Sequence, residues 1–506
     1  MMIKIDSLLN RVTAYRLVLY VLIGFVAVAV PLAALKLLPF SPVALLISTA
    51  FLVAMCWAAN TVLARIFDIP ANVESTFITA LILALIIDPI HTATDLQLLG
   101  WAAILATASK YILSINNKHI FNPAAIAVVI TAFALGEPAS WWVGTASMLP
   151  FVLLGGWIIL RKLRQEDMAI SFVIAALSTM VVACILLNTS ITNQFRLLVL
   201  ATPLFFFASI MLTEPLTAPP THDLKRVYGI LAGILFVPQI HIGSIYSTPE
   251  LALIVVNVFS YVVSSKQRVL LKLKRKIKVS SDIIDFVLTP SQRLAFLPGQ
   301  YMEFTLDHPH PDARGNRRYF TLASSPTEDA LHLGVRFYDR GSSFKHALYA
   351  MDGRTKILGA QIAGDFTLPS DPAQKLVFIA GGIGITPYRS MLKYLLDTQQ
   401  QRDIVLIYAN RTVKDIAYRD VLSQAETQLN LKTIYTLTDT KAIPPNWEGH
   451  KGRIDERMIR AAVPDYRERT YYLSGPPDMV RGYEEVLKAL EVKPEQIKRD
   501  FFPGLV

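Results

Sequence analysis

The chain has 506 residues, enough for several domains, and 53% of them are hydrophobic. The apolar residues are concentrated before residue 266, in predicted helices that are apolar all round, which argues against a soluble all-helical protein. The net charge of +10 comes largely from loops and from the linker 266–278, where anionic lipid headgroups explain it better than nucleic acid does.

Ten apolar segments predict a polytopic, all-α membrane domain over residues 1–267. A membrane span needs about 20 apolar residues. The expected spans are residues 14–38, 42–64, 73–87, 96–114, 123–136, 142–160, 168–187, 197–212, 227–240 and 249–264. The shorter ones suit broken or tilted helices. No cleavable signal peptide is evident, because the first segment is too long and has no small-residue cleavage site.

The basic residues of the short loops predict the orientation of these spans. One set of loops holds most of the Lys and Arg, whereas the opposite set holds only Lys36 and Arg196. By the positive-inside rule both termini are cytoplasmic, as an even number of spans requires. We therefore expect an integral protein of the cytoplasmic (inner) membrane, with the lipid bilayer as partner and the C-terminal domains in the cytoplasm.

Two of the segments indicate an internal repeat. The third ends at Asp88-Pro89 and the eighth at Glu214-Pro215, an offset of 126 residues, or five spans. An odd number of spans inverts the second copy, which predicts an inverted repeat with a site near the repeat interface. The alternative is that acidic-Pro pairs simply end helices. Hydroxyl side chains and prolines around both pairs suit irregular backbone that lines a cavity.

The two cysteines and the histidines argue against familiar redox metals. Cys56 and Cys184 cannot complete a four-thiolate iron–sulfur cluster, and they are most simply small apolar residues of helices. A shared redox or metal site between them is the alternative. The histidines of this half lie at the ends of the predicted spans, so no bis-histidine haem relay is expected, and no metal site is predicted.

Three segments of this half carry a resemblance. They are Ser109-Lys110-Tyr111, the run from His119 to Ala125 that contains Asn122-Pro123, and the later turn Thr213-Glu214-Pro215. Together they resemble the flavin-carrying membrane subunits of the sodium-pumping NADH:quinone reductase and of the Rnf complex, over roughly residues 15–265.

The resemblance implies a second flavin in the membrane domain. The family carries FMN on the threonine of a Ser-Gly-Ala-Thr segment, and this chain has none; residues 144–147 come nearest. We therefore expect a non-covalent FMN or riboflavin near Asn122, Thr213 and Glu214.

From Leu270 onward the pattern is that of two ordinary soluble domains. Short alternating segments predict an antiparallel β-barrel over residues 268–369, with strands at 271–279, 283–288, 301–306, 319–323 and 331–337. Alternating strands and helices then predict a parallel α/β domain over 370–506. Its strands are expected at 376–380, 404–408, 432–437 and 470–473, and its helices at 386–396, 415–427, 455–463 and 477–490.

Two segments of the predicted barrel have side chains that suit a flavin dinucleotide. In the run from Arg318 to Ser324, an arginine can neutralise a diphosphate, Phe320 can stack on a flavin ring and Thr321 can hydrogen-bond near its N5. The turn Gly341-Ser342-Ser343 leads into a helix whose N–H groups suit a pyrophosphate.

A glycine turn opens the α/β domain. Gly381, Gly382 and Gly384 follow an apolar strand, and Thr386-Pro387 open a helix, so backbone can approach a pyrophosphate at the helix N-terminus. Alone, such a turn is equally a plain strand–helix corner. Two further segments, around Asn410-Arg411 and Ser474-Gly475-Pro476, follow the glycine turn. The order and spacing of these segments and of the two flavin segments argue against a chance occurrence.

Together these segments resemble the ferredoxin–NADP reductase superfamily over about residues 270–506. The resemblance implies an FAD barrel followed by an NAD(P)-binding domain. Arg318, Phe320 and Thr321 match the flavin motif, Ser342 and Ser343 the FAD phosphate segment, Gly381 to Pro387 the nicotinamide-nucleotide turn, and Ser474 to Pro477 the Cys-Gly-Pro-Pro segment, with Ser474 in place of Cys. The C-terminal residues Phe501 and Phe502 match a tail that approaches the flavin.

The expected chemistry is hydride transfer from NAD(P)H to FAD, after which the flavin releases single electrons. No side-chain acid or base is needed, and Thr321 and Ser474 would orient flavin and nicotinamide. Arg411 suits either a 2′-phosphate or an ion pair, so NADH is only slightly favoured. The leading expectation is electron transfer through the membrane domain to an outer-face acceptor. The alternatives are an NAD(P)H:quinone reductase, with or without ion coupling, and a small-molecule or flavin transporter with a regulatory reductase domain.

Overall fold

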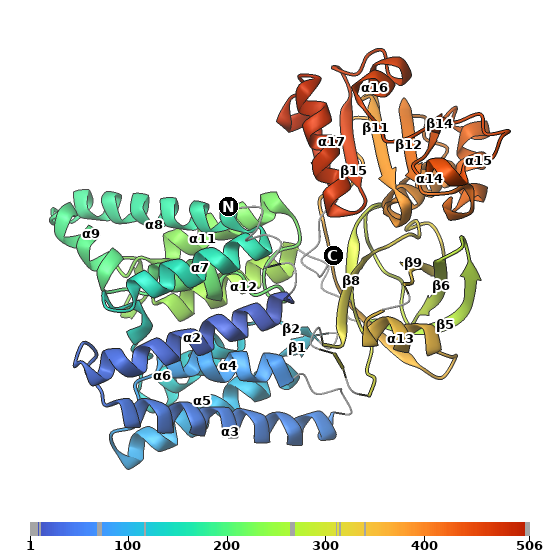
Figure 1. The fold of residues 1–506 in the computed structure, drawn as a ribbon. Helices are drawn as coiled ribbons and strands as arrows, with labels where there is room; N and C mark the ends of the chain where they lie inside the picture. The colour runs from blue at the N-terminus through green and yellow to red at the C-terminus, as the bar shows by residue number, and fades with distance from the viewer. Residues whose placement is uncertain are drawn as a thin grey trace. The chain divides into compact units, whose positions relative to one another are not determined.

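The computed structural model describes Leu9 and residues 12–67, 73–115, 118–263, 269–309, 311–312, 315–338 and 341–500. Its internal contacts divide the chain into two compact units, residues 1–267 and 268–504 (Figure 1).

The first unit consists of helices and two short hairpins. Its first half contains α2 (Ala14–Ala34), α3 (Pro42–Ile66), α4 (Val73–Ile86), α5 (Ala93–Ile112), the hairpin β1 (Ser114–Ile115) and β2 (Lys118–His119), and α6 (Pro123–Leu135). Its second half contains η1 (Trp142–Gly144), α7 (Leu149–Leu163), α8 (Glu166–Leu186), α9 (Ile191–Leu200), α10 (Leu204–Phe206), the π-helix η2 (Phe207–Met211), α11 (His222–Phe236), the hairpin β3 (His241–Ile242) and β4 (Ile245–Tyr246), and α12 (Pro249–Val263).

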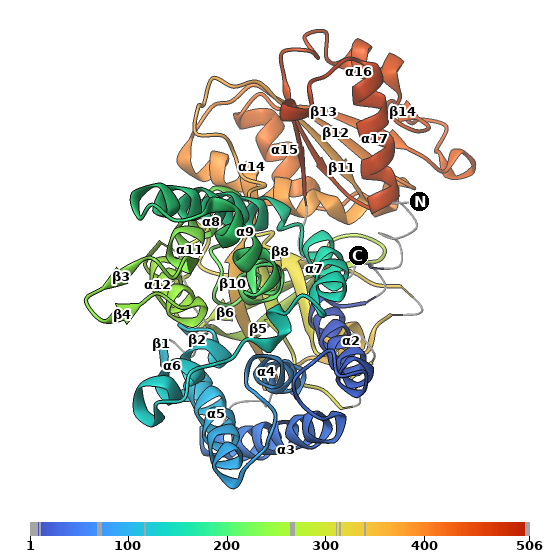
Figure 2. The same ribbon diagram turned by 90° about the vertical axis from the view of Figure 1, so that its left-hand side faces the viewer.

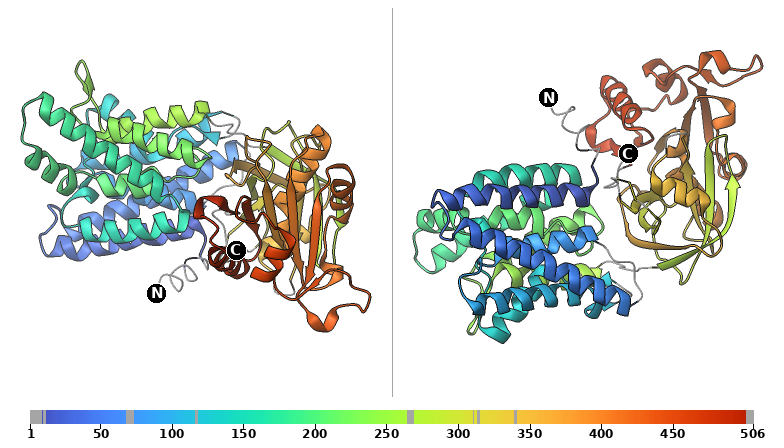
Figure 3. Two further views of the ribbon diagram at one scale, coloured as in Figure 1. Left: turned by 90° about the horizontal axis from the view of Figure 1, so that it is seen from above. Right: turned by 60° about the horizontal axis from the view of Figure 1, so that its bottom comes forward.

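After η1, the second half follows the element order of the first when α9, α10 and η2 are taken together as the counterpart of α4, and each half has a hairpin before its last helix. Helices at corresponding places also pack together, α2 on α7 and α6 on α12. Both are features that a repeat would have, and the inversion of the second copy stays a prediction. The longest helices run alongside one another (Figure 3).

Three helices are long and apolar enough to cross a membrane: α2, α3 and α8. The bent pair of residues 191–200 and 204–211, whose parts meet at 58°, would be a fourth. The expectation of about ten spans is therefore wrong for the described residues. The apolar helices α4, α6 and α12 have 14, 13 and 15 residues. Hydropathy reports apolar composition but not where a helix begins or ends. Prolines begin α6 and α12, and another proline separates α9 from α10, so these helices are shorter than the apolar segments.

Helix α11 lies directly against α8 because glycines let their backbones approach. A Cβ added at Gly229 would be 2.5 Å from the Met168 carbonyl oxygen, and one at Gly233 would be 2.4 Å from that of Phe172. This contact fixes the position of Tyr228, which is fully buried next to Gly229.

The second unit begins with a six-stranded antiparallel sheet in the order β8-β7-β10-β5-β6-β9. The strands are β5 (Val269–Lys278), β6 (Ile283–Pro290), β7 (Tyr301–Thr305), β8 (Arg317–Thr321), β9 (Leu331–Arg336) and β10 (Lys356–Ala363), and α13 (Ser343–Ala350) precedes β10. The antiparallel class is confirmed. Strand β10 was not expected, and it lies in the middle of the sheet.

A six-stranded parallel sheet follows, in the order β14-β13-β12-β11-β15-β16 (Figure 2). Its strands are β11 (Leu376–Gly381), β12 (Ile404–Asn410), β13 (Lys432–Leu437), β14 (His450–Lys451), β15 (Thr470–Ser474) and β16 (Ile497–Arg499). Its helices are η3 (Gly382–Ile385), α14 (Thr386–Thr398), η4 (Val413–Asp415), α15 (Arg419–Gln428), η5 (Thr440–Ala442), α16 (Glu456–Ala462), α17 (Pro477–Ala489) and η6 (Pro494–Gln496). The predicted parallel α/β class is confirmed.

The parallel sheet is covered on both faces. This is required because every residue of β11 is buried and successive side chains of a strand point to opposite faces. Leu376, Phe378 and Ala380 lie in one core with residues of α14 and α15, and Val377 and Ile379 lie in the other with residues of α16 and α17. After β11 the chain builds β12 on one side of it and β15 on the other. Ligands of open α/β sheets bind at the carboxyl ends of the strands at such a switch point.

Candidate functional site

The glycine turn lies at this switch point. Ala380 of β11 is paired with Ser474 of β15, so Gly381 to Gly384 and Ser474 to Pro476 emerge side by side. A Cβ added at Gly384 would be 2.3 Å from the Ser474 carbonyl oxygen, and one at Gly381 would be 2.1 Å from Met479 Sδ. Gly382 has φ +54, and Thr386 and Pro387 start α14. The two segments can lie this close together only because glycines, which have no Cβ, form the turn.

Asp500 belongs to this corner, and no motif in the sequence indicates it. Ser474 Oγ donates a hydrogen bond of 2.8 Å to Asp500 Oδ2, and Asp500 N donates one of 2.9 Å to the Leu473 carbonyl. The carboxyl is half-buried, and desolvation raises its pKa to about 6, although the Ser474 hydrogen bond opposes this rise. The short strand β16, which was not expected, places Asp500 there.

The flavin segment forms β8 at the edge of the antiparallel sheet. Among the described strands β8 pairs only with β7. Phe320 is half-buried, with its ring centroid 5.9 Å from that of Phe304, and Thr321 is buried opposite Tyr301.

Arg318 and the start of α13 meet at Asp312. Arg318 NH2 is 3.5 Å from Asp312 Oδ1, and Ser343 N donates a hydrogen bond of 3.1 Å to Asp312 Oδ2. Ser342 caps α13, its Oγ accepting from Lys345 N at 3.2 Å, and Gly341 precedes it. A guanidinium, two serines and a helix N-terminus are the donors that a diphosphate needs, so the residues present fit FAD.

The remaining predicted residues are not brought to these two segments by the described structure. Ser324 is fully buried, and its carbonyl accepts a hydrogen bond of 2.5 Å from Ser390 Oγ on α14. Arg411 is exposed just beyond β12. Phe501 and Phe502 lie outside the described residues.

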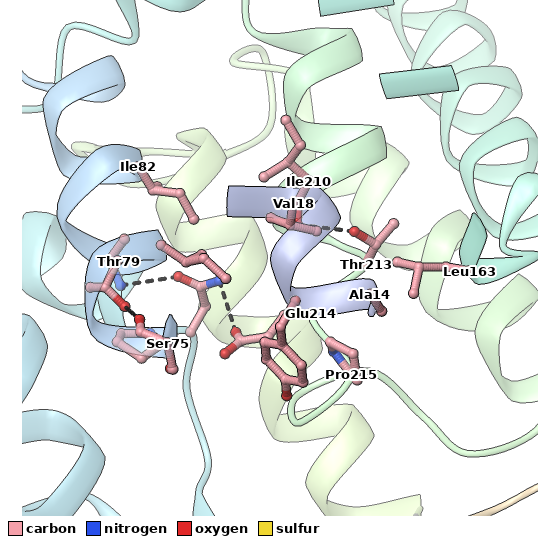
Figure 4. Close-up of a pocket in the computed structure, with 15 residues that line it drawn as sticks. Ala14, Val18, Ser75, Thr79, Ile82, Leu163, Ile210, Thr213, Glu214 and Pro215 are labelled. Atoms are coloured by element: carbon pink, nitrogen blue, oxygen red, sulfur yellow. Dashed lines mark hydrogen bonds between the residues drawn. The ribbon is translucent and has the colours of Figure 1, made fainter. Parts of the chain in front are cut away.

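The first unit holds a pocket at the place predicted for a second flavin. Asn122, Thr213 and Glu214 all line it, with Tyr15 and apolar side chains of α2, α4 and η2. Figure 4 shows Ser75 and Thr79 of α4 on one side and Thr213 and Glu214 on the other. The π-helix η2 ends just before these two residues, and π-helices are frequent at functional sites.

A buried network holds Asn122 at this pocket. Its Oδ1 caps α6 by accepting hydrogen bonds from Ala124 N and Ala125 N. This orients the amide so that its Nδ2 donates to Glu214 Oε2 at 2.9 Å. Its backbone N donates to Asn257 Oδ1 at 2.8 Å, and Asn257 Nδ2 donates to Tyr228 Oη at 2.8 Å. Among the described residues no cluster of three or more His, Cys, Asp or Glu is arranged for a metal ion.

Comparison with known proteins supports the assignment of the second unit. Residues 378–485 match the family model described as "Oxidoreductase NAD-binding domain". The stachydrine N-demethylase reductase subunit Stc4 of Rhizobium meliloti is 29% identical over 197 residues, 38% of this chain and 54% of that protein. The flavohemoprotein of Bacillus subtilis is 27% identical over 236 residues, 45% of this chain and 57% of that protein.

Among solved structures, the Amycolatopsis cytochrome P450 reductase GcoB is 24% identical, with a TM-score of 0.42, over 47% of this chain and 70% of that one. The chain spans about three-fifths of the length of the curated relatives it matches. The C-terminal part of the chain is thus similar to reductase subunits and flavohemoproteins, and residues 378–485 match an oxidoreductase NAD-binding domain.

Proposed function

We propose that this oxidoreductase is bound in the cytoplasmic membrane, takes hydride from cytoplasmic NAD(P)H onto FAD, and passes electrons through the first unit to an acceptor on the outer face. The observation that carries the proposal is the pocket at Asn122 and Glu214, a polar site inside an apolar helical unit on the same chain as a reductase.

The exposed surface of the first unit supports a lipid environment. In the apolar 18-residue stretches of α2, α3 and α8, only 33%, 22% and 33% of the residues are buried. Trp57, Trp101 and Ile174 are each more than half exposed. Continuous apolar surface of this kind is costly in water and is favoured in a bilayer.

In the second unit the proposed work of the side chains is binding and orientation. FAD, when bound, accepts a hydride and gives up its electrons singly. Arg318, Ser342 and Ser343 would hold its diphosphate, and Phe320 and Thr321 of β8 would orient the ring. The corner from Gly381 to Thr386 would hold the nicotinamide dinucleotide, and Ser474 would contact its nicotinamide end.

A second, non-covalent flavin in the pocket would carry electrons onward. The hydrocarbon core is about 30 Å thick, too far for one useful transfer, so a site at depth is needed. Asn122 and Glu214 supply directed polar groups on otherwise apolar walls, as such sites require.

The pocket also supports a second candidate, an NAD(P)H:quinone reductase. Val18, Ile78, Ile82 and Ile210 give it apolar walls, which suit a quinone ring as well as a flavin ring. The two candidates differ in what occupies the pocket and in whether electrons reach the outer face.

Flavin counting in the purified full chain tests the proposal. Acid extraction should release FAD and a second flavin, with no fluorescent band on a denaturing gel. Sealed vesicles with the reductase domains outside should then reduce an impermeant acceptor trapped in their lumen when NADH is added. A single FAD per chain, with reduction of added quinone but not of the trapped acceptor, would favour the quinone reductase instead.

A further inference from the structure

We propose that Arg389 is a positioning residue for hydride transfer, which fixes the spacing between the flavin segment and the nicotinamide turn. The inference rests on the reductase part of the proposed function. Arg389 is on α14, three residues after Thr386, and is only 6% exposed. It therefore acts through the backbone that it holds and contacts no cofactor itself.

The guanidinium joins the two sheets of the second unit. Arg389 NH1 donates a hydrogen bond of 2.7 Å to the Ala323 carbonyl, two residues after Thr321 at the end of β8. NH1 and NH2 also donate to the two carboxylate oxygens of Glu328, at 2.7 and 3.0 Å. The helix that begins at the nicotinamide turn is thus tied directly to the chain leaving the flavin segment.

Neighbouring hydrogen bonds fix the same loop at further points. Ser390 Oγ donates to the Ser324 carbonyl at 2.5 Å, and Ser325 N donates to Glu328 Oε2 at 2.7 Å. Three consecutive residues of the loop after β8 are therefore held by α14 or by the carboxylate bound to it.

The barrel strands hold the far side of this network. His332 of β9 has its Nε2 3.6 Å from Glu328 Oε1 and its Nδ1 2.6 Å from Asp285 Oδ2 on β6. The Arg389 guanidinium also lies 5.5 Å from the centroid of the Tyr418 ring. A buried, bidentate pair with both sides anchored gives one fixed geometry, whereas removal of one partner leaves an uncompensated charge.

Hydride transfer depends steeply on this geometry. A misplacement of about 1 Å can cost roughly 10²-fold in rate. Lysine at position 389 would keep the charge but, having one nitrogen, could not hold both the Ala323 carbonyl and the Glu328 fork. Since Arg389 Nε has no hydrogen-bond partner in the described protein, the hydrogen bonds that the substitution removes are those of the two terminal nitrogens.

A matched control exists in the same unit. Arg469 is also 6% exposed and also makes a bidentate pair, with Asp403 at 2.7 and 3.0 Å, but at the opposite ends of the parallel strands. Arg469→Lys should therefore cost stability without changing the spacing of flavin and nicotinamide.

The test is anaerobic stopped-flow reduction of the bound FAD by saturating NADH in the full chain. We expect Arg389→Lys to lower the limiting rate about 10²-fold and to weaken the flavin–nicotinamide charge-transfer absorbance, with FAD content and NADH affinity within twofold of wild type. Arg469→Lys should keep the wild-type rate. Ser390→Ala, a milder change, should lower the rate several-fold if Arg389→Lys does not fold.

Equal limiting rates in Arg389→Lys and Arg469→Lys at equal FAD content would overturn the proposal, as would a wild-type rate in Ser390→Ala when Arg389→Lys does not fold. The experiment measures only the reduction of FAD by NADH. It therefore tests Arg389 even if the proposed electron transfer through the first unit is wrong. A wild-type FAD that neither NADH nor NADPH reduces would overturn the positioning role and the proposed reductase function together.

Discussion

Ser474 Oγ donates a 2.8 Å hydrogen bond to Asp500 Oδ2 across the switch point of the parallel sheet. The pair joins the end of β15 to the residue after β16, beside the glycine turn. It places a carboxyl with a pKa of about 6 next to the serine that we propose contacts nicotinamide.

The raised pKa of Asp500 predicts how stability depends on pH. The folded carboxyl binds a proton more tightly than the unfolded one, with a pKa of about 6 instead of the ordinary 3.8. The folded state therefore holds more protons between these values, and the contribution of Asp500 to stability falls as pH rises from about 4 to 6. Asp500→Asn keeps an acceptor for Ser474 and removes this dependence.

We accordingly expect the FAD-release temperature of Asp500→Asn, relative to wild type, to rise from pH 4 to pH 7. FAD fluorescence during heating gives this temperature. A constant difference across that range would show that the carboxyl does not titrate with a raised pKa.

Gly384→Ala should block reduction by NAD(P)H while FAD stays bound. Its Cβ would be 2.3 Å from the Ser474 carbonyl oxygen, and backbone there cannot move aside cheaply. Overpacking costs about 1–3 kcal/mol, and where this cost falls on the nucleotide-binding form of the corner it lowers the affinity for NADH about 5- to 150-fold. Titration with NADH measures the effect.

Gly482→Ala is the matched control, because an added Cβ there meets nothing within 4 Å. Similar NADH affinities in the two variants would argue against a nucleotide site at the Gly384 corner.

Arg318→Ala should release FAD and leave the first unit folded. The guanidinium supplies the positive charge of the proposed diphosphate site, and a charge-assisted hydrogen bond contributes about 1.5–3 kcal/mol, or roughly 10- to 100-fold in FAD affinity. Flavin extraction after gel filtration gives the FAD content. Arg354→Ala, an exposed arginine of the same sheet domain, should retain it. Full FAD occupancy in Arg318→Ala would contradict the assignment.

Asn122→Ala should lose the second flavin and keep FAD. The substitution removes the cap of α6, which costs roughly 1 kcal/mol, and also the donor to Glu214. Ser41→Ala removes only a cap, that of α3, whose Ala44 N donates to Ser41 Oγ at 3.1 Å. Extraction should therefore distinguish the two variants by one flavin, and an equal flavin content in both would remove the pocket as the flavin site.

The strands and helices that the sequence predicted well are those whose pattern is local. Leu376 to Gly381 is a continuous apolar strand before glycines, and the structure has it within a residue of the expected end. Strand β10 has weak local signals: Gly359 and Ala360 are poor strand formers, and Gln361 has φ +52 beside a bulge. Its pairing with β5 and β7 is decided by distant residues, so sequence pattern alone could not reveal it.

The residues of the candidate site also divide into those with a local sequence pattern and those placed by distant contacts. Residues in contiguous motifs, such as Gly384, could be identified from spacing. Asp500 could not, because its contact with Ser474 depends on a three-residue strand that only the parallel sheet creates. The Arg389–Glu328 pair likewise joins residues 61 positions apart that carry no motif.

The place of β8 at the end of its sheet has a consequence for biosynthesis. The edge strand of a sheet is a template for pairing with another chain, and proteins usually blunt such edges. If FAD lies along β8, the cofactor does this blunting, and chains made without it lack that protection. Growth under riboflavin limitation should then yield aggregated chains, whereas flavin supplied during translation should keep them dispersed.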